Sequence, residues 1–212
     1  PEWHHKDIFA HTLQVVDNAA KLTDKMEIRF AALVHDIAKP VTRRIDPDKG
    51  YTFHGHDAIG EKMLNKVSQR LRLSNKLSSY IKKLTLLHLR PIALVKSEVT
   101  DSAVRRLMVS AGDEIQDLMI LCRADITTKN PKMVKKYLRN FDIVEDKMKI
   151  VLNKDSAKIF QSPVRGKEIM EIFKIKEGKQ VGIFKKEVEE AILEGEIENT
   201  YDAAKRYLLD RK

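Results

Sequence analysis

The chain has 212 residues, 42% hydrophobic and 33% charged, with 40 Lys and Arg against 31 Asp and Glu and a formal net charge of +9. No apolar run approaches the roughly 20 residues that a bilayer-spanning helix needs, and the basic, histidine-rich start does not resemble a signal peptide. We therefore expect a soluble, cytoplasmic protein without a membrane partner. Its single cysteine, Cys122, excludes an internal disulfide and a cysteine-based zinc cage, and the basic surplus favours a polyanionic partner.

The hydrophobic pattern predicts helices along the whole chain and an all-α fold. Asp7 is the expected N-cap of the first helix, Pro40 is expected to end the second, and Arg90-Pro91 is expected to end the fourth. A turn over 46–50 and a short extended piece over 51–54 are the exceptions to helix. The predicted helices cover about 7–22, 27–38, 57–71, 75–90, 101–111, 113–128, 131–152, 166–173, 181–194 and 200–209.

The second predicted helix is apolar up to Val34 and then presents His35 and Asp36 side by side. An ionised carboxylate at the end of a buried helix is costly unless a partner compensates its charge. A divalent cation would do so, because imidazole and carboxylate are both metal ligands. The alternative is a capped helix end whose histidine donates to a backbone carbonyl.

Two distant residues strengthen the metal interpretation. His11 shares a helix face with Ile8 and Val15, and Asp125 follows Leu121 and Cys122 on an apolar face. Both side chains are therefore expected to point inward, and a lone inward carboxylate is rare.

Two further histidines are candidates for the same site. The loop that leaves Asp36 returns at His56, which is predicted to be an additional metal ligand or a phosphate-binding group, whereas His54 is expected to be exposed. His88 follows Ile81 and Leu84 on an inward face, and is either a core histidine or a ligand.

The order His11, His35-Asp36, Asp125 resembles that of the HD-domain superfamily of metal-dependent phosphohydrolases. A change of composition over 154–163 predicts a boundary between a first domain at 1–153 and a helical module at 154–212. The resemblance implies that the first of these is an HD domain. The chain as a whole resembles the C-terminal region of bacterial tRNA nucleotidyltransferases of the poly(A) polymerase family. The segments that carry this second resemblance are 5–13, 53–57, 164–170, 177–182 and 191–199.

In that family a separate N-terminal head adds the nucleotides, using two aspartates one residue apart after a glycine-rich turn. Asp46-Pro47-Asp48 has the spacing but lacks the preceding turn, and is typical of a loop. Because the chain also begins at Pro1 without methionine, we expect a fragment of a longer nucleotidyltransferase that does not itself add nucleotides.

The resemblance implies that the HD domain hydrolyses a phosphomonoester or a 2′,3′-cyclic phosphate. His11, His35, Asp36 and Asp125 would bind a divalent Mg, Mn, Fe, Co or Ni ion, and Asp36 or Asp125 would orient the attacking water. Lys39 and Arg90 would neutralise phosphate. His56 and His88 would allow a second metal.

The alternative function is a non-catalytic body that binds tRNA or another RNA for the missing head. Basic residues on one side of the long helix over 131–152 are the candidate contacts to a phosphate backbone. They are Lys132, Lys135, Lys136 and Arg139.

Overall fold

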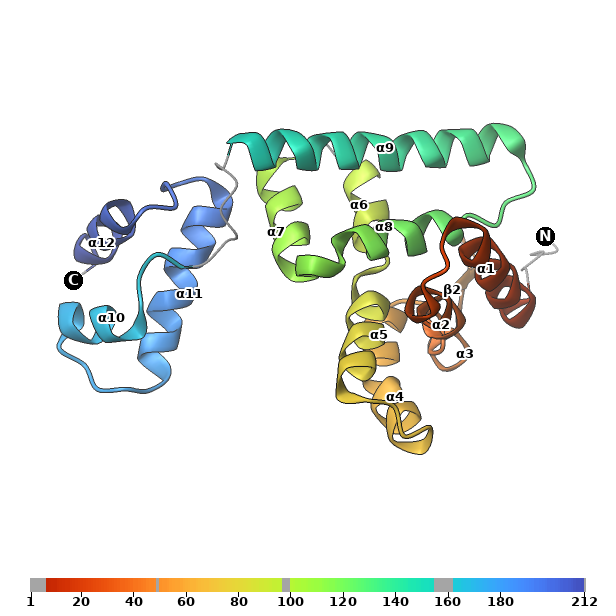
Figure 1. Cartoon of the computed structure of the whole chain (residues 1–212), viewed down its shortest axis with the longest axis horizontal. Helices are drawn as coiled ribbons and strands as arrows, with labels where there is room; N and C mark the ends of the chain where they lie inside the picture. The colour runs from red at the N-terminus through yellow and green to blue at the C-terminus, as the bar shows by residue number, and fades with distance from the viewer. Residues whose placement is uncertain (1–6, 49, 97–99, 155–161, 212) are drawn as a thin grey trace. The chain divides into compact units, whose positions relative to one another are not determined.

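The computed structural model describes residues 7–48, 50–96, 100–154 and 162–211 (Figure 1). These residues confirm the all-α prediction, since the strands among them are confined to one hairpin, β1 (Arg44–Asp46) with β2 (Gly50–Thr52). The strands are antiparallel and pair Arg44 with Thr52. Within this described part of the chain, no helix has the length and apolar character needed to cross a membrane.

The described residues fall into two compact units, the first within Pro1–Glu98 and Ser110–Glu145 and the second within Val99–Val109 and Asp146–Lys212. The proposed boundary at 153/154 lies in the last turn of the helix α9 (Pro131–Lys154). Most of the composition change that suggested it falls at 155–161, outside the described residues. The domain limits therefore stay a prediction. Residues 5 and 6 of the first family-like segment also lie outside the described chain.

In the first unit, the helix α2 (Met26–Val34) packs against α1 (Ile8–Leu22), α5 (Asn75–Leu87) and α8 (Ile115–Ala124). The core of this unit contains fully buried Ile28 from α2, Leu64 from α4 (His56–Arg70), Ile81 and Leu84 from α5, and Leu118 from α8. Its helices are α1 (Ile8–Leu22), α2 (Met26–Val34), α3 (Lys39–Thr42), α4 (His56–Arg70), α5 (Asn75–Leu87), α6 (Arg90–Lys96), the 3₁₀ turn η1 (Gly112–Glu114), α8 (Ile115–Ala124) and the start of α9 (Pro131–Lys154).

Three predicted helix starts are confirmed by side-chain caps, at Asp7, Ser74 and Thr200. The Asp7 carboxylate accepts a hydrogen bond from the Ala10 amide at 2.8 Å. Two predictions about proline are wrong. The second helix ends at Val34 rather than at Pro40, which lies inside the short helix α3, and Pro91 lies in the first turn of α6 rather than ending the helix before it. Both positions suit proline because the first turn of a helix leaves its N–H groups unpaired.

The second unit has its own small core. Val164, Ile169, Val188, Ile192, Ala204 and Leu208 are buried together, and the Phe173 and Phe184 rings stack at 3.9 Å. Its helices are α7 (Asp101–Ala111), the end of α9, α10 (Gly166–Phe173), α11 (Lys179–Glu194) and α12 (Tyr201–Leu209). The buried cluster explains why these short amphipathic helices form, since helices of this length need tertiary packing.

Candidate metal centre

A tight turn at the end of α2 presents His35 and Asp36. The Ile37 amide donates to the Val34 carbonyl at 3.1 Å, and the Lys39 amide donates to the Asp36 carbonyl at 2.9 Å. These bonds span three residues instead of four, so the chain tightens where the two side chains leave it. His35 is 0% and Asp36 2% exposed.

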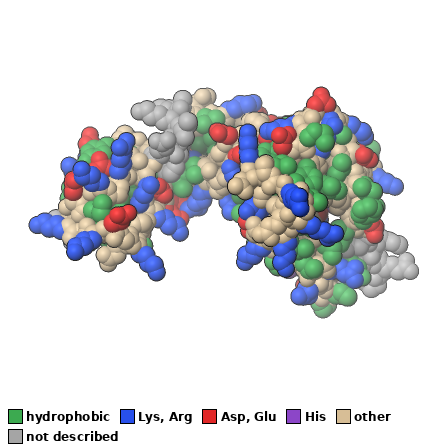
Figure 2. All heavy atoms as spheres, turned by 60° about the horizontal axis from the view of Figure 1, so that its bottom comes forward, with side chains coloured by type: hydrophobic (Ala, Val, Ile, Leu, Met, Phe, Trp, Pro, Cys, Tyr) green, Lys and Arg blue, Asp and Glu red, His purple; other side chains and the backbone are tan. Residues whose placement is uncertain are grey.

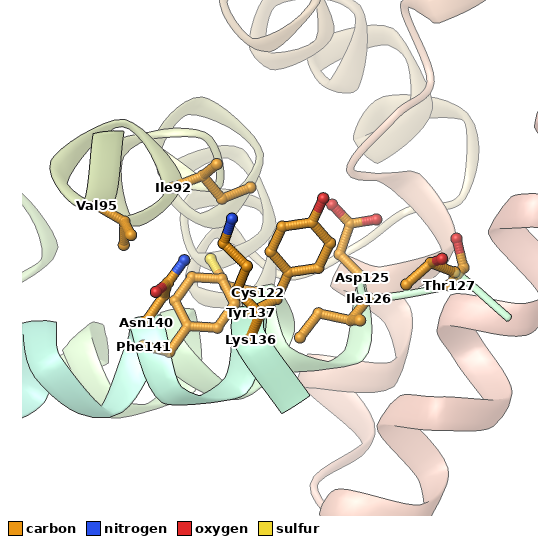
Figure 3. A pocket seen from close by; sticks show the side chains of 11 residues that line it. Ile92, Val95, Cys122, Asp125, Ile126, Thr127, Lys136, Tyr137, Asn140 and Phe141 are labelled. Atoms are coloured by element: carbon orange, nitrogen blue, oxygen red, sulfur yellow. The ribbon is translucent and has the colours of Figure 1, made fainter. Parts of the chain in front are cut away.

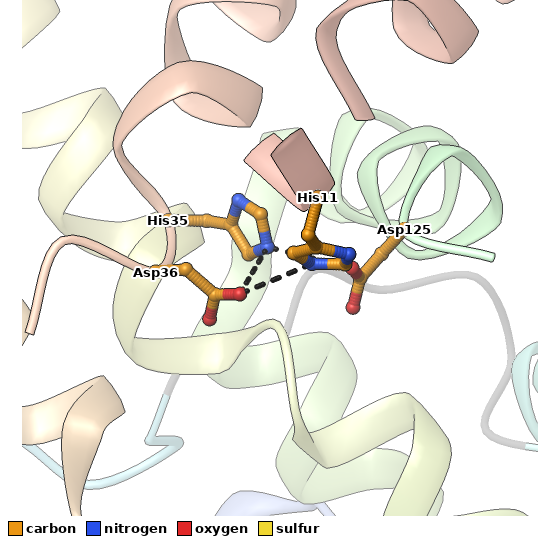
Figure 4. Close-up of side chains that lie close together, drawn as sticks. All are labelled: His11, His35, Asp36 and Asp125. Carbon is orange, nitrogen blue, oxygen red and sulfur yellow. Dashed lines mark ion pairs between the residues drawn. The ribbon is translucent and has the colours of Figure 1, made fainter. Parts of the chain in front are cut away.

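His11 and Asp125 meet this pair, as predicted (Figure 4). His11 Nε2 lies 3.0 Å from Asp125 Oδ1 and 3.2 Å from Asp36 Oδ2. His35 Nε2 lies 3.5 Å from Asp125 Oδ1 and 3.2 Å from Asp36 Oδ2. Side chains from α1, the end of α2 and the end of α8 thus surround one point.

The facing atoms of these four residues fit a divalent ion. Among the described residues, seven buried side-chain polar atoms have no hydrogen-bond partner, and five belong to this group: His11 Nε2, His35 Nε2, both Asp36 oxygens and Asp125 Oδ1. The atoms are close, but their contacts lack hydrogen-bond geometry. Two ligands about 2.1 Å from one ion, at angles of about 90° to 110°, lie about 3.0–3.4 Å apart. Three of the four separations above fall in this range, and the fourth, between His35 Nε2 and Asp125 Oδ1, is slightly longer at 3.5 Å.

The other ring nitrogen of each of the four histidines in the two groups is engaged by the protein. A backbone carbonyl can only accept, so an imidazole bonded to one carries its proton on Nδ1 and directs the Nε2 lone pair at the site. The Nδ1 contacts are His35 with the Ala32 carbonyl at 2.8 Å, His56 with the Phe53 carbonyl at 2.7 Å, His88 with the Thr85 carbonyl at 2.6 Å and His11 with the Thr127 hydroxyl at 3.0 Å.

The imidazoles and carboxylates of this group shift one another's pKa values. Burial lowers the pKa of His35, but the carboxylates of Asp125 and Asp36 outweigh it and raise that pKa to about 10. The same carboxylates raise the pKa of His11. Burial opposes ionisation of Asp36 and Asp125, yet the neighbouring imidazoles hold both carboxyl pKa values far below their usual range. The imidazoles and the carboxylates therefore stabilise each other's charged forms, and Lys39 Nζ also pairs with Asp36. A divalent cation would be attracted by the same two carboxylates.

A second group shares Asp36. His56 Nε2 lies 3.3 Å and His88 Nε2 3.7 Å from Asp36 Oδ1, and the two ring nitrogens are 3.2 Å apart. Burial, reinforced by the charge on His35, lowers the pKa of His88 to about 4, so this imidazole is neutral at physiological pH. These three residues also offer one ligand atom each within reach of a common ion. His54 is exposed, as predicted.

The remaining predicted site residues are placed differently. Lys39 Nζ lies 2.5 Å from Asp36 Oδ2 at the edge of the site. The Arg90 guanidinium instead donates to the Ser110 hydroxyl at 3.1 Å and belongs to neither ligand group. The four basic residues predicted to bind nucleic acid, Lys132, Lys135, Lys136 and Arg139, are all exposed and follow the i, i+3, i+4, i+7 spacing of one helix face on α9. At the edges of this face, Lys136 lines a pocket beside Asp125, and Lys135 and Arg139 line a different one.

Two supporting residues were not predicted. Thr127 contacts His11, and the Asn18 amide donates to the Ala124 carbonyl at 2.9 Å, which fixes the end of α8 beside α1. Asn18 follows His11 by seven residues and so shares its helix face, a signal that was available in the sequence. Thr127 follows Asp125 in an irregular segment, where periodicity gives no information.

The metal-ligand geometry and the helical fold agree with the comparison to known families. The family model of the HD domain matches residues 8–130, and the chain belongs to this family. The match contains all of His11, His35, Asp36, His56, His88 and Asp125.

Curated relatives extend the likeness over nearly the whole chain. It is 28% identical over 213 residues to a CC-adding tRNA nucleotidyltransferase of Thermus thermophilus, covering 97% of this chain and 45% of the relative. It is 26% identical to an A-adding tRNA nucleotidyltransferase of Deinococcus radiodurans, covering 95% and 46%. A multifunctional CCA protein of Vibrio campbellii is 32% identical over 129 residues, which cover 58% of this chain and 31% of that protein. The chain thus spans about half the length of the first two relatives.

Proposed function

We propose that this chain is a metal-dependent phosphohydrolase that acts on a phosphomonoester or a 2′,3′-cyclic phosphate. The observation that supports it most strongly is the set of five buried polar atoms without hydrogen-bond partners on His11, His35, Asp36 and Asp125. Four of them, the two imidazole Nε2 atoms, Asp36 Oδ2 and Asp125 Oδ1, surround one point. Such atoms are expensive to bury unless a cation satisfies them. A set of two imidazoles and two carboxylates suits Mg, Mn, Fe, Co or Ni ions better than a structural zinc site.

In this proposal the four ligands hold the ion, which when bound supplies a Lewis acid and a water of lowered pKa. The backbone carbonyl and Thr127 contacts keep the ligand nitrogens directed inward. Asp36 and Asp125 present carboxylate oxygens that can accept a hydrogen bond from the attacking water and orient it. His56 and His88 bind either a second ion or the phosphate, with Asp36 shared between the two groups.

Access to Asp36 supports a hydrolytic site. A cavity of about 760 Å³ borders Asp36 and is lined in part by Phe9, Arg43 and Tyr51. The Arg43 guanidinium lies 4.9 Å from the Tyr51 ring centroid. Together with Lys39, Arg43 would attract a phosphate dianion to this opening.

The test is phosphate release by the purified chain after its metal has been removed and then returned. We expect activity with at least one of the named metals, and a loss of roughly 100-fold or more in Asp36→Asn, because even outer-shell changes at metal sites cost 10- to 100-fold. Asp17→Asn, an exposed change on α1, is the matched control. Folded wild-type protein that releases no phosphate with any of these metals would overturn the proposal.

A second candidate function is that of a non-catalytic body that binds tRNA or another RNA, within a longer cytoplasmic nucleotidyltransferase. It is supported by the similarity to tRNA nucleotidyltransferases over 97% of the chain and by the exposed lysines of α9. Lys and Arg side chains are spread over the visible face of both units in Figure 2. Steeply salt-dependent tRNA binding that survives Asp36→Asn would support it.

A further inference from the structure

A pocket of about 510 Å³ adjoins the candidate metal centre on the Asp125 side (Figure 3). Its volume lies in the range typical of small-molecule sites. Asp125 is both a wall of the pocket and a member of the ligand group, so a molecule whose phosphate reached the metal centre would place its organic part here.

The pocket combines apolar walls with a few polar groups. Ile92 and Val95 of α6 border one side, and Phe141 of α9 adds an aromatic surface. Tyr137 and Asn140, also from α9, project into the same space in Figure 3. This composition suits a flat ring better than a sugar or a peptide, because a ring can cover the apolar and aromatic surfaces while its edge bonds to an amide.

The polar groups match the edge of a heteroaromatic ring. The Asn140 amide offers donors and an acceptor, the Tyr137 hydroxyl offers one of each, and Lys136 adds a cation at the rim. Tyr137 is 39% exposed, so its ring is accessible for stacking. All three residues lie beyond residue 130, where the HD domain match ends, so the shared family region does not supply this wall.

We infer that α9 forms a specificity wall, in which Tyr137 and Asn140 bind the heteroaromatic base of a nucleoside phosphate whose phosphate lies at the metal centre. The metal ligands then act on the phosphate, and α9 selects the group that carries it. This inference rests on the proposed function only for the position of the phosphate, since the base itself is bound without metal.

Binding of a nucleoside that carries no phosphate separates the two proposals. We expect adenosine to bind metal-free protein by calorimetry, and ribose, which lacks the base, not to bind. Tyr137→Ala and Asn140→Ala should each weaken adenosine binding on the order of tenfold, the usual scale for loss of a stacking or bidentate contact to a base. Ile143→Ala, at a 50% exposed position on α9 outside the pocket lining, is the matched control and should bind as the wild type does.

Hydrolysis provides the second readout. The preference in kcat/KM for adenosine monophosphate over glycerol phosphate should fall about tenfold in Tyr137→Ala, mainly through KM. Adenosine binding without hydrolysis of any ester would support the pocket and overturn the proposed hydrolase. No adenosine binding, or equal binding by wild type and Tyr137→Ala, would overturn the inference even in an active enzyme.

Discussion

Replacing Thr127 by valine should weaken divalent-metal binding while leaving the protein folded. The Thr127 hydroxyl lies 3.0 Å from His11 Nδ1 and is the side-chain contact that orients this ligand. Valine has nearly the same shape but can neither accept nor donate a hydrogen bond. The His11 ring would then rotate more freely, and its Nε2 would spend less time directed at Asp36 and Asp125.

The expected loss of metal affinity is about 10- to 100-fold, the usual effect of removing an outer-shell partner, which corresponds to about 1.4–2.7 kcal/mol. The bond is only partly buried, so we expect the lower half of that range and a fall in unfolding free energy of about 1 kcal/mol. Isothermal titration of metal-stripped protein with Mn²⁺ measures the affinity. Thr128→Val is the matched control, since that hydroxyl contacts the Asn130 amide instead. Equal Mn²⁺ affinity for Thr127→Val and wild type would refute this account of how His11 is oriented.

Three other outcomes follow from the described contacts. Metal binding should release protons, and metal affinity should increase as pH rises from about 6 towards 10, because the pKa of His35 is raised to about 10 and its imidazolium must lose a proton to coordinate. Calorimetric titrations in buffers of different ionisation enthalpy count the released protons, and a pH-independent affinity would contradict the expectation. Gly60→Ala should lower the unfolding free energy by about 1–3 kcal/mol in denaturant titrations, because an added Cβ would lie 3.1 Å from Thr85 Cγ2. An unchanged unfolding free energy would mean that α4 and α5 can move apart at little cost. If the chain binds tRNA through α9, Lys135→Ala should reduce the slope of log affinity against log salt by about 1, and an unchanged slope would remove this lysine from the interface.

Periodicity, the adjacent His35-Asp36 pair and the resemblance to the HD superfamily together identified the four principal candidate ligands, each of which lies on an apolar helix face or at its end. His11 has Ile8 and Val15 on its face, and Asp125 follows Leu121, so an inward direction could be deduced before any tertiary contact was known. The structure brings the ligand atoms within 4.8 Å of one another. Their role as metal ligands stays a prediction until an ion is measured.

Other features depend on tertiary packing and could not be predicted in this way. The carbonyls of Ala32 and Phe53 contact candidate ligand histidines, but every residue has a carbonyl and none is marked in the sequence. The turn after Val34 allows Pro40 to enter a new helix, although proline in a helical pattern usually signals an end. Arg90 follows the candidate ligand His88 by two residues, yet its guanidinium donates to the Ser110 hydroxyl, a contact between residues 20 positions apart that the sequence does not indicate.

Anomalous diffraction from crystals of the chain soaked in Mn²⁺ tests the central claim most directly. The account predicts a peak about 2.0–2.3 Å from His11 Nε2, His35 Nε2 and oxygens of Asp36 and Asp125, with any second peak on the side of His56 and His88. A saturating soak that gives no peak among these atoms, or a peak elsewhere in the chain, would contradict it.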